Sequence, residues 1–160
     1  TDEDELNEAM EELKIQSKLN KAYTIDEVRD KMINGAAAIG VIYSGEYLYC
    51  QEENEDLEYV IPKEGTNIWY DGWVITKGSE NVENAHKWID FLCSQEAAYD
   101  NFEYIYYGTP NIAAQELIDE DIINNPGVFP DEETIEKCEV YNYLGEEAED
   151  MYYELWKKVK

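Results

Sequence analysis

The chain has 160 residues, the size of one ordinary domain, and carries 38 Asp and Glu against 12 Lys and Arg, a net charge of −26. This charge repels phosphate backbones and anionic lipids, which excludes a nucleic-acid-binding protein and one that binds anionic membranes directly. The chain is also 44% hydrophobic and 13% aromatic, with four Trp and fourteen Tyr, which excludes a disordered acidic chain.

The longest apolar run, the first residues and the cysteines indicate in what cellular setting the chain occurs. The longest apolar run, 36–43, is far shorter than the roughly 18 residues that span a membrane. No signal peptide opens the sequence and residue 1 is not Met, so we expect a piece of a longer protein. The scattered cysteines Cys50, Cys93 and Cys138 are typical of buried thiols and neither require nor forbid an oxidising compartment.

The N-terminal region predicts two helices. Apolar residues recur at helical spacing from Leu6 to Leu13, and acidic residues fill the first turn, where the helix dipole favours them. Thr24 and Glu27 have the spacing of a capping box at the start of a second helix, and Gly35 is a natural end for it.

The next region predicts strands. The continuous apolar run 36–42 is typical of a strand buried on both faces, and a helix followed by such a strand is the unit of a parallel α/β sheet. In a later extended segment, Trp69, Asp71 and Trp73 share one alternating face. We predict two further strands, at 57–61 and 67–76, separated by a turn at 62–65.

The rest of the chain predicts mainly helices. Ser94 and Asn111 are typical N-caps, and in the last helix the acidic residues precede the basic ones, as the dipole favours. The predicted helices cover 82–93, 94–104, 111–118, 132–137 and 146–160, with irregular chain at 124–131 and a strand at 140–144.

Catalytic signatures are absent from the sequence. The lone His86 reads as a surface or edge histidine, and without a second His there is no HExxH site or common zinc finger. There is no Gly-rich phosphate loop, no nucleophile elbow and no EF-hand loop. The sequence therefore favours a protein that is not an enzyme, with no catalytic residue, no metal site and no cofactor.

The aromatic segment 67–73 carries the most informative chemistry. Asp71 lies inside an otherwise aromatic stretch, so its carboxylate must be solvated, paired or placed to meet a cation. One interpretation is a carboxylate at a strand bulge beside Gly72 that bonds to backbone. The other is half of an amine-binding site, in which ring faces attract an ammonium group at about 0.5–2 kcal/mol per contact and the carboxylate neutralises its charge.

Several stretches together resemble the spermidine/putrescine-binding proteins of bacterial ABC transporters. The resemblance runs from about Ala9 to the end, in the order 38–45, 60–65, Trp69-Tyr70-Asp71, 107–111 and 129–145. It implies an α/β fold of the type II periplasmic-binding-protein-like class, of which this chain is the C-terminal half of a two-lobed clamshell receptor.

The resemblance also implies a ligand site. Trp69 and Tyr43 match the aromatic walls of the family, and Asp71 matches its amine-pairing carboxylate. Glu46 falls where putrescine-type members place an acid, so it is expected to pair with a terminal ammonium group. Tyr141 stands where spermidine-type members carry a Gln that caps one end of the ligand.

The resemblance further implies a domain organisation and partners. Residues 1–69 and 116–160 would belong to the second lobe, and 70–115 to the first lobe, whose remaining sheet this chain does not contain. We therefore expect a dimer or a swapped form of the fragment. The implied partners are a polyamine ligand and an ABC transporter permease, in an extracytoplasmic location, with contact to the membrane only through an anchor or the permease.

Two other classes of function remain open at this stage. An acidic protein-interaction module would dock basic partners in a salt-sensitive way, without preference among diamines. A hydrolase would need a carboxylate pair that 38 acidic residues do not single out.

Overall fold

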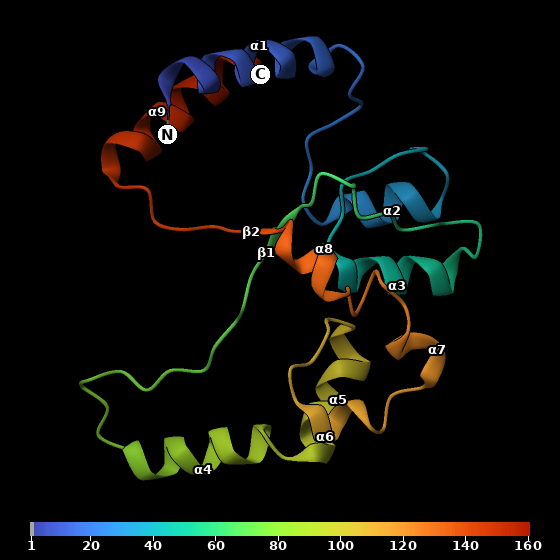
Figure 1. Ribbon diagram of the computed structural model, residues 1–160, viewed down its shortest axis with the longest axis vertical. Coiled ribbons are helices and arrows are strands. Elements are labelled where there is room, and N and C mark those ends of the chain that lie inside the picture. The colour runs from blue at the N-terminus through green and yellow to red at the C-terminus, as the bar shows by residue number, and fades with distance from the viewer. Residues whose placement is uncertain (1) are drawn as a thin grey trace. The chain divides into compact units, whose positions relative to one another are not determined.

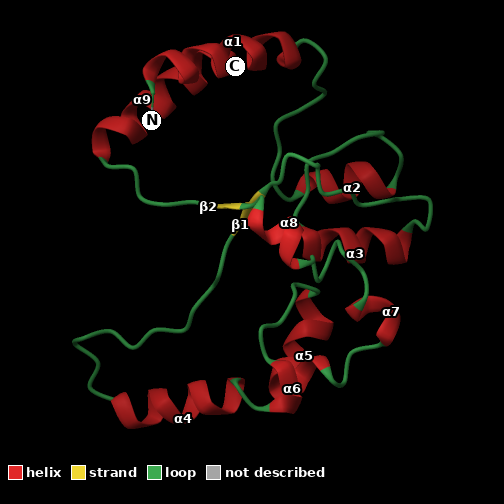
Figure 2. Cartoon of the chain, in the orientation of Figure 1, coloured by secondary structure: helices red, strands yellow, loops and turns green. Residues whose placement is uncertain are grey.

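The computed structural model describes residues 2–160, which group into two compact units. The terminal unit contains the chain up to Glu27 and from Tyr141 onward, and the central unit contains Val28–Val140. Helices dominate both units, and the described residues form one short sheet (Figure 2).

The terminal unit is a pair of amphipathic helices, α1 (Glu3–Ser17) and α9 (Glu146–Val159), which lie side by side (Figure 1). Met10 from α1 packs with Leu155 and Val159 from α9 in a small buried cluster. The first was predicted from apolar spacing and an acidic first turn and the second from acidic residues that precede basic ones, and both predictions are confirmed.

The central unit contains the remaining helices. Ser94, Asn111 and Asp131 each accept a hydrogen bond from a backbone N–H in the first turn of the helix that follows, which confirms the predicted caps at Ser94 and Asn111. The helices are α2 (Glu27–Ile33), α3 (Ser44–Glu53), α4 (Val82–Leu92), α5 (Gln95–Ile105), α6 (Ile112–Gln115), α7 (Glu120–Ile123) and α8 (Glu132–Glu136).

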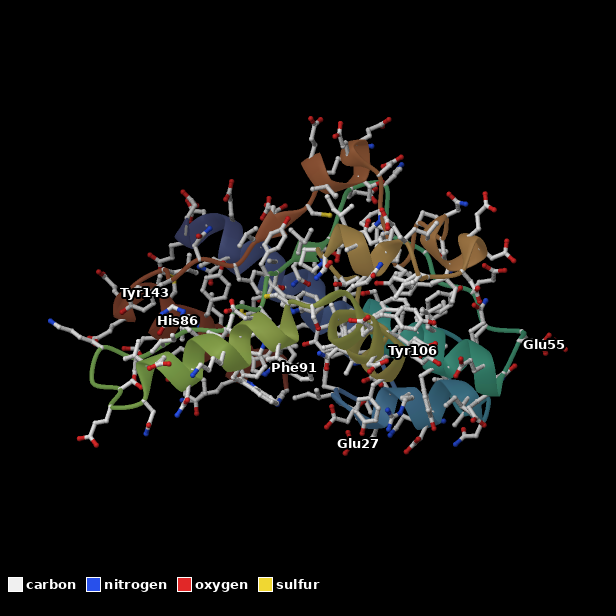
Figure 3. All side chains as sticks on the ribbon, turned by 90° about the horizontal axis from the view of Figure 1, so that it is seen from below. Glu27, Glu55, His86, Phe91, Tyr106 and Tyr143 are labelled. Carbon is white, nitrogen blue, oxygen red and sulfur yellow. The ribbon has the colours of Figure 1, made fainter. Side chains whose placement is uncertain are left out.

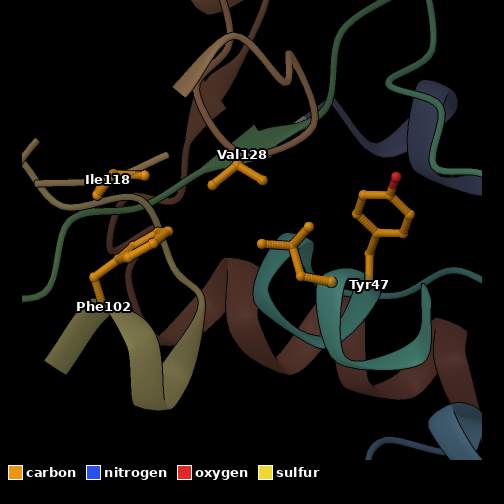
Figure 4. Close-up of a cluster of buried hydrophobic side chains, with 5 residues drawn as sticks. Tyr47, Phe102, Ile118 and Val128 are labelled. Atoms are coloured by element: carbon orange, nitrogen blue, oxygen red, sulfur yellow. The ribbon is translucent and has the colours of Figure 1, made fainter. Parts of the chain in front are cut away.

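The core of the central unit joins α3 and α5 to the loops that follow α6 and α7. Tyr47 and Leu48 from α3 meet Phe102 from α5, and Ile118 and Val128 close the cluster (Figure 4). This cluster fixes α3 relative to the end of α5, which is the geometry on which the candidate site below depends.

The predicted strands are mostly wrong. Residues 36–42 and 57–61 are irregular, and Ile39 and Val41 are 91% and 96% exposed. The segments predicted at 67–76 and 140–144 reduce to β1 (Asn67–Ile68) and β2 (Glu139–Val140), which pair in parallel. A strand needs backbone hydrogen bonds to a neighbouring strand. Among the described residues, no strand pairs with 36–42.

The apolar stripe of α4, formed by Ala85, Trp88, Ile89 and Leu92, is only partly covered in the central unit. No residue of α4 is fully buried, and Trp88 and the neighbouring Phe91 are more than half exposed. Figure 3 shows Phe91 and His86 on this helix. His86 on the same helix is also exposed, which confirms the prediction of a surface histidine.

The cysteines differ in environment. Cys50 is buried, as predicted, and its thiol pKa is raised, chiefly by burial. Cys93 is exposed, so the prediction of a buried thiol is wrong there because the helix end at Cys93 is uncovered. Cys138 is partly buried.

Candidate functional site

The N-terminus of α3 presents two of the predicted site residues. Tyr43 precedes the helix in an extended conformation, and its carbonyl oxygen accepts a hydrogen bond from the N–H of Tyr47. Glu46 lies in the first turn. The sequence predicted a buried strand at 36–42, directly before these residues. The structure has the start of a helix here instead, where the dipole favours a carboxylate.

Three aromatic rings from separate parts of the sequence meet at this helix start. Trp69, the residue after β1, lies edge-on to Tyr43 with ring centroids 5.2 Å apart. It also lies edge-on to Tyr107, at 5.8 Å. Edge-to-face contacts of this kind hold rings in place while leaving part of each face free. Trp69 is 38% exposed, so the cluster is open to a ligand.

Tyr107 is the site residue that sequence reasoning missed. Its ring lies against the backbone of Gly45, where a Cβ would come within 2.6 Å of the ring. Burial, and then the nearby charge of Glu46 and the more weakly acting charge of Asp71, raise the pKa of Tyr107 to about 12, so its hydroxyl stays protonated at neutral pH. An aromatic residue directly before the Gly108-Thr109-Pro110 turn was the available signal.

The backbone before Tyr107 is held in an unusual conformation. Tyr106 ends α5 with a positive φ of 57°, uncommon for a residue with a side chain. Its hydroxyl donates a 2.6 Å hydrogen bond to a carboxylate oxygen of Glu52 on α3, and this bond is the main reason its pKa is raised to about 12. The left-handed conformation of Tyr106 turns the chain at the end of α5, and the ring of Tyr107 then lies against Gly45 at the start of α3.

The two predicted acids differ in their partners. Asp71 follows Trp69 by two residues and is exposed. Glu46 is instead paired with Arg29 of α2, whose Nη1 lies 3.2 Å from Glu46 Oε2. Both carboxylates raise the pKa of the Tyr107 hydroxyl, Glu46 more strongly than Asp71.

Tyr141, the remaining predicted site residue, belongs to the terminal unit. It follows β2 directly in the sequence, and its side chain is 80% exposed. Its role at one end of a ligand stays a prediction.

The close approach of Tyr107 to Gly45 yields a testable expectation. In Gly45→Ala, the new Cβ meets a ring and, at 2.7 Å, the carbonyl oxygen of Ile105, neither of which is a flexible side-chain end. Overpacking of this kind costs about 1–3 kcal/mol. That exceeds the roughly 0.5–1 kcal/mol gained when Ala replaces Gly inside a helix. We expect lower stability in chemical denaturation and altered Trp fluorescence.

Gly78→Ala is the matched control, because a Cβ at Gly78 meets nothing within 4 Å. A Gly45→Ala variant that is as stable as the control or more so would show that Tyr107 does not rest on Gly45.

Comparison with known proteins identifies the family. The family model for bacterial extracellular solute-binding proteins matches residues 4–130. The chain belongs to this family. Among curated proteins, the spermidine/putrescine-binding periplasmic proteins of Salmonella typhimurium and Escherichia coli are 34% and 32% identical to it over 160 residues. These matches cover 100% of this chain and 46% of each relative, so the chain spans about half the length of the relatives.

Solved structures support the same fold. A putative spermidine/putrescine ABC transporter from Listeria monocytogenes matches with a TM-score of 0.81 at 40% identity, over 94% of this chain and 47% of the other. The spermidine/putrescine substrate-binding protein PotD from Streptococcus pneumoniae matches with a TM-score of 0.84 at 36% identity, over 94% and 46%. The predicted fold class, a partial periplasmic-binding-protein-like α/β fold, is confirmed.

Membrane-spanning helices and metal-binding clusters are both absent from the described part of the chain. Among residues 2–160, no helix combines the length and apolar character that a membrane span requires. Within the same residues, no group of three or more His, Cys, Asp or Glu side chains is arranged to hold a metal ion.

Proposed function

We propose that this chain is the C-terminal half of an extracytoplasmic polyamine receptor that delivers its ligand to an ABC permease. The observation that carries the proposal is the meeting of Tyr43, Trp69 and Tyr107, with Asp71 two residues beyond Trp69. The names of the relatives, which are spermidine/putrescine-binding proteins, support the same ligand class.

The site chemistry suits a flexible alkyl amine. Ring faces pack against methylene groups and attract ammonium at about 0.5–2 kcal/mol per contact. A carboxylate offsets the cost, several kcal/mol, of taking that ammonium out of water. The cluster presents rings and carboxylates together, whereas an anion would call for positively charged hydrogen-bond donors.

The uncovered surfaces fit a receptor of two lobes. In this proposal, residues 1–69 and 116–160 belong to one lobe and 70–115 to the other. The exposed stripe of α4 lies within 70–115, and the exposed run 36–42 has the composition of a strand without neighbours. The remaining half of the receptor would cover both. Ligand binding would then close the lobes, and the closed form would dock on the permease.

Thermal shift of the full-length receptor tests this function. We expect spermidine or putrescine to raise the melting temperature, because a ligand that binds only the folded state stabilises it. Lysine and magnesium serve as controls for binding to any cation and should have no effect. Equal shifts with all four compounds, or salt-sensitive binding to many basic proteins without a polyamine response, would contradict the proposal and favour an acidic interaction module.

A further inference from the structure

Arg29 forms an ion pair with the carboxylate of Glu46. One guanidinium nitrogen lies 3.2 Å from Glu46 Oε2, and the guanidinium carbon lies 4.7 Å from the ring centre of Tyr49 on α3. The Nε of Arg29 is buried and makes no hydrogen bond among the described residues. Arg29 is thus held by a single hydrogen bond and one ring face, well short of the forked pairing it can make with a carboxylate.

The pair lies beside the aromatic cluster. Arg29, Glu46 and Tyr107 line one cavity of about 180 Å³, together with Gly45 and Tyr49. The ring of Tyr107 is shared between this cavity and the contact with Trp69. An ammonium group bound at the cluster would therefore lie near a carboxylate that is already neutralised.

We propose that Arg29 is a specificity-determining residue, because its ion pair with Glu46 leaves Asp71 as the unpaired member of the two predicted ligand-binding acids. This inference rests on the proposed polyamine function and deepens it. Without Arg29 the site would offer two carboxylates, and a ligand with two ammonium groups would benefit more than a ligand with one. Arg29 acts through Glu46 and so is a positioning residue toward the ligand.

Calorimetry with two ligands of equal carbon chain tests the proposal on the full-length receptor. Putrescine carries two ammonium groups and butylamine carries one, so the ratio of their affinities isolates the second ammonium. In Arg29→Gln, we expect this ratio to rise at least about threefold, since the freed Glu46 is available only to the second charge. Arg29→Lys keeps the positive charge and should keep the wild-type ratio.

The double variant Arg29→Gln/Glu46→Gln is the charge-matched control, because it has the net charge of the wild type. We expect it to restore the wild-type ratio. A long-range effect of the lost positive charge would also raise the ratio, because putrescine carries twice the charge of butylamine. Lys87→Gln, which removes one positive charge from the exposed surface of α4, controls for this effect and should keep the wild-type ratio. The two side chains of the pair are 38% and 33% exposed, so its loss should leave the fold intact, which thermal unfolding checks.

The outcomes separate this inference from the function on which it rests. A wild-type receptor that binds neither amine would overturn the proposed function, and the inference with it. A wild-type receptor that binds putrescine, with a ratio unchanged in Arg29→Gln or equally raised in the double variant, would overturn the inference alone.

Discussion

Asp71→Asn in the full-length receptor should weaken putrescine binding by roughly 30-fold to several thousand-fold. The asparagine keeps the shape of the side chain and removes its charge, which leaves a bound ammonium group unpaired. The corresponding cost is about 2–5 kcal/mol for a desolvated charge pair. Isothermal titration calorimetry measures it directly, and the loss should fall on the dissociation rate more than on the association rate.

Asp56→Asn is the matched control for this experiment. Asp56 is exposed in the turn after α3, and its substitution changes the net charge by the same amount. If the charge of −26 acted mainly by long-range attraction of cations, both variants would lose affinity alike. A change of less than about threefold in Asp71→Asn would remove Asp71 from the site.

Gly65→Ala should produce the largest loss of stability. Gly65 has a φ of +91°, which residues with a side chain rarely adopt, and a Cβ at this position would clash with the carbonyl oxygen of Lys137. Backbone strain and overpacking each cost about 1–3 kcal/mol, so we expect about 2–6 kcal/mol in total. Chemical denaturation measures the loss of free energy of unfolding.

The position of Gly65 links this stability to the site. Gly65 is followed by Thr66, whose carbonyl oxygen accepts a hydrogen bond from the N–H of Glu139. This bond is adjacent to the first residue pair of the β1–β2 sheet. Trp69 follows β1, so we also expect altered Trp fluorescence. Gly72→Ala, whose new Cβ would meet nothing within 4 Å, should change stability by no more than about 0.5 kcal/mol. Equal losses in the two variants would show that the conformation of Gly65 in the turn before β1 is not the cause.

Helices were predictable from the sequence because their signals are local. Apolar spacing, acidic first turns and N-caps such as Ser94 and Asn111 act within a few residues. The helices α4, α5 and α9 therefore lie close to their predicted bounds, and α1 covers the predicted N-terminal helix. The helix α3 was not predicted, because its first turn directly follows the run 36–42, which was predicted to be a strand.

Local sequence also indicated the chemistry of the site. Asp71 beside Trp69 showed that a carboxylate accompanies rings, and the resemblance to polyamine-binding proteins added Tyr43 and Glu46. The family is confirmed by comparison, while the roles of these residues stay predictions. The net charge alone would have favoured a general cation binder, and it did not distinguish Asp71 from the other acids.

Tertiary structure decided the features that need partners distant in the sequence. An apolar run such as 36–42 becomes a strand only when other strands supply its hydrogen bonds, so its exposure could not be read from its residues. Tyr107 joins the rings because the left-handed turn at Tyr106 and the bare backbone of Gly45 allow it. Likewise, Arg29 reaches Glu46 across 17 residues of sequence. The tertiary structure therefore decides which acid is paired, because only folding brings Arg29 within reach of Glu46.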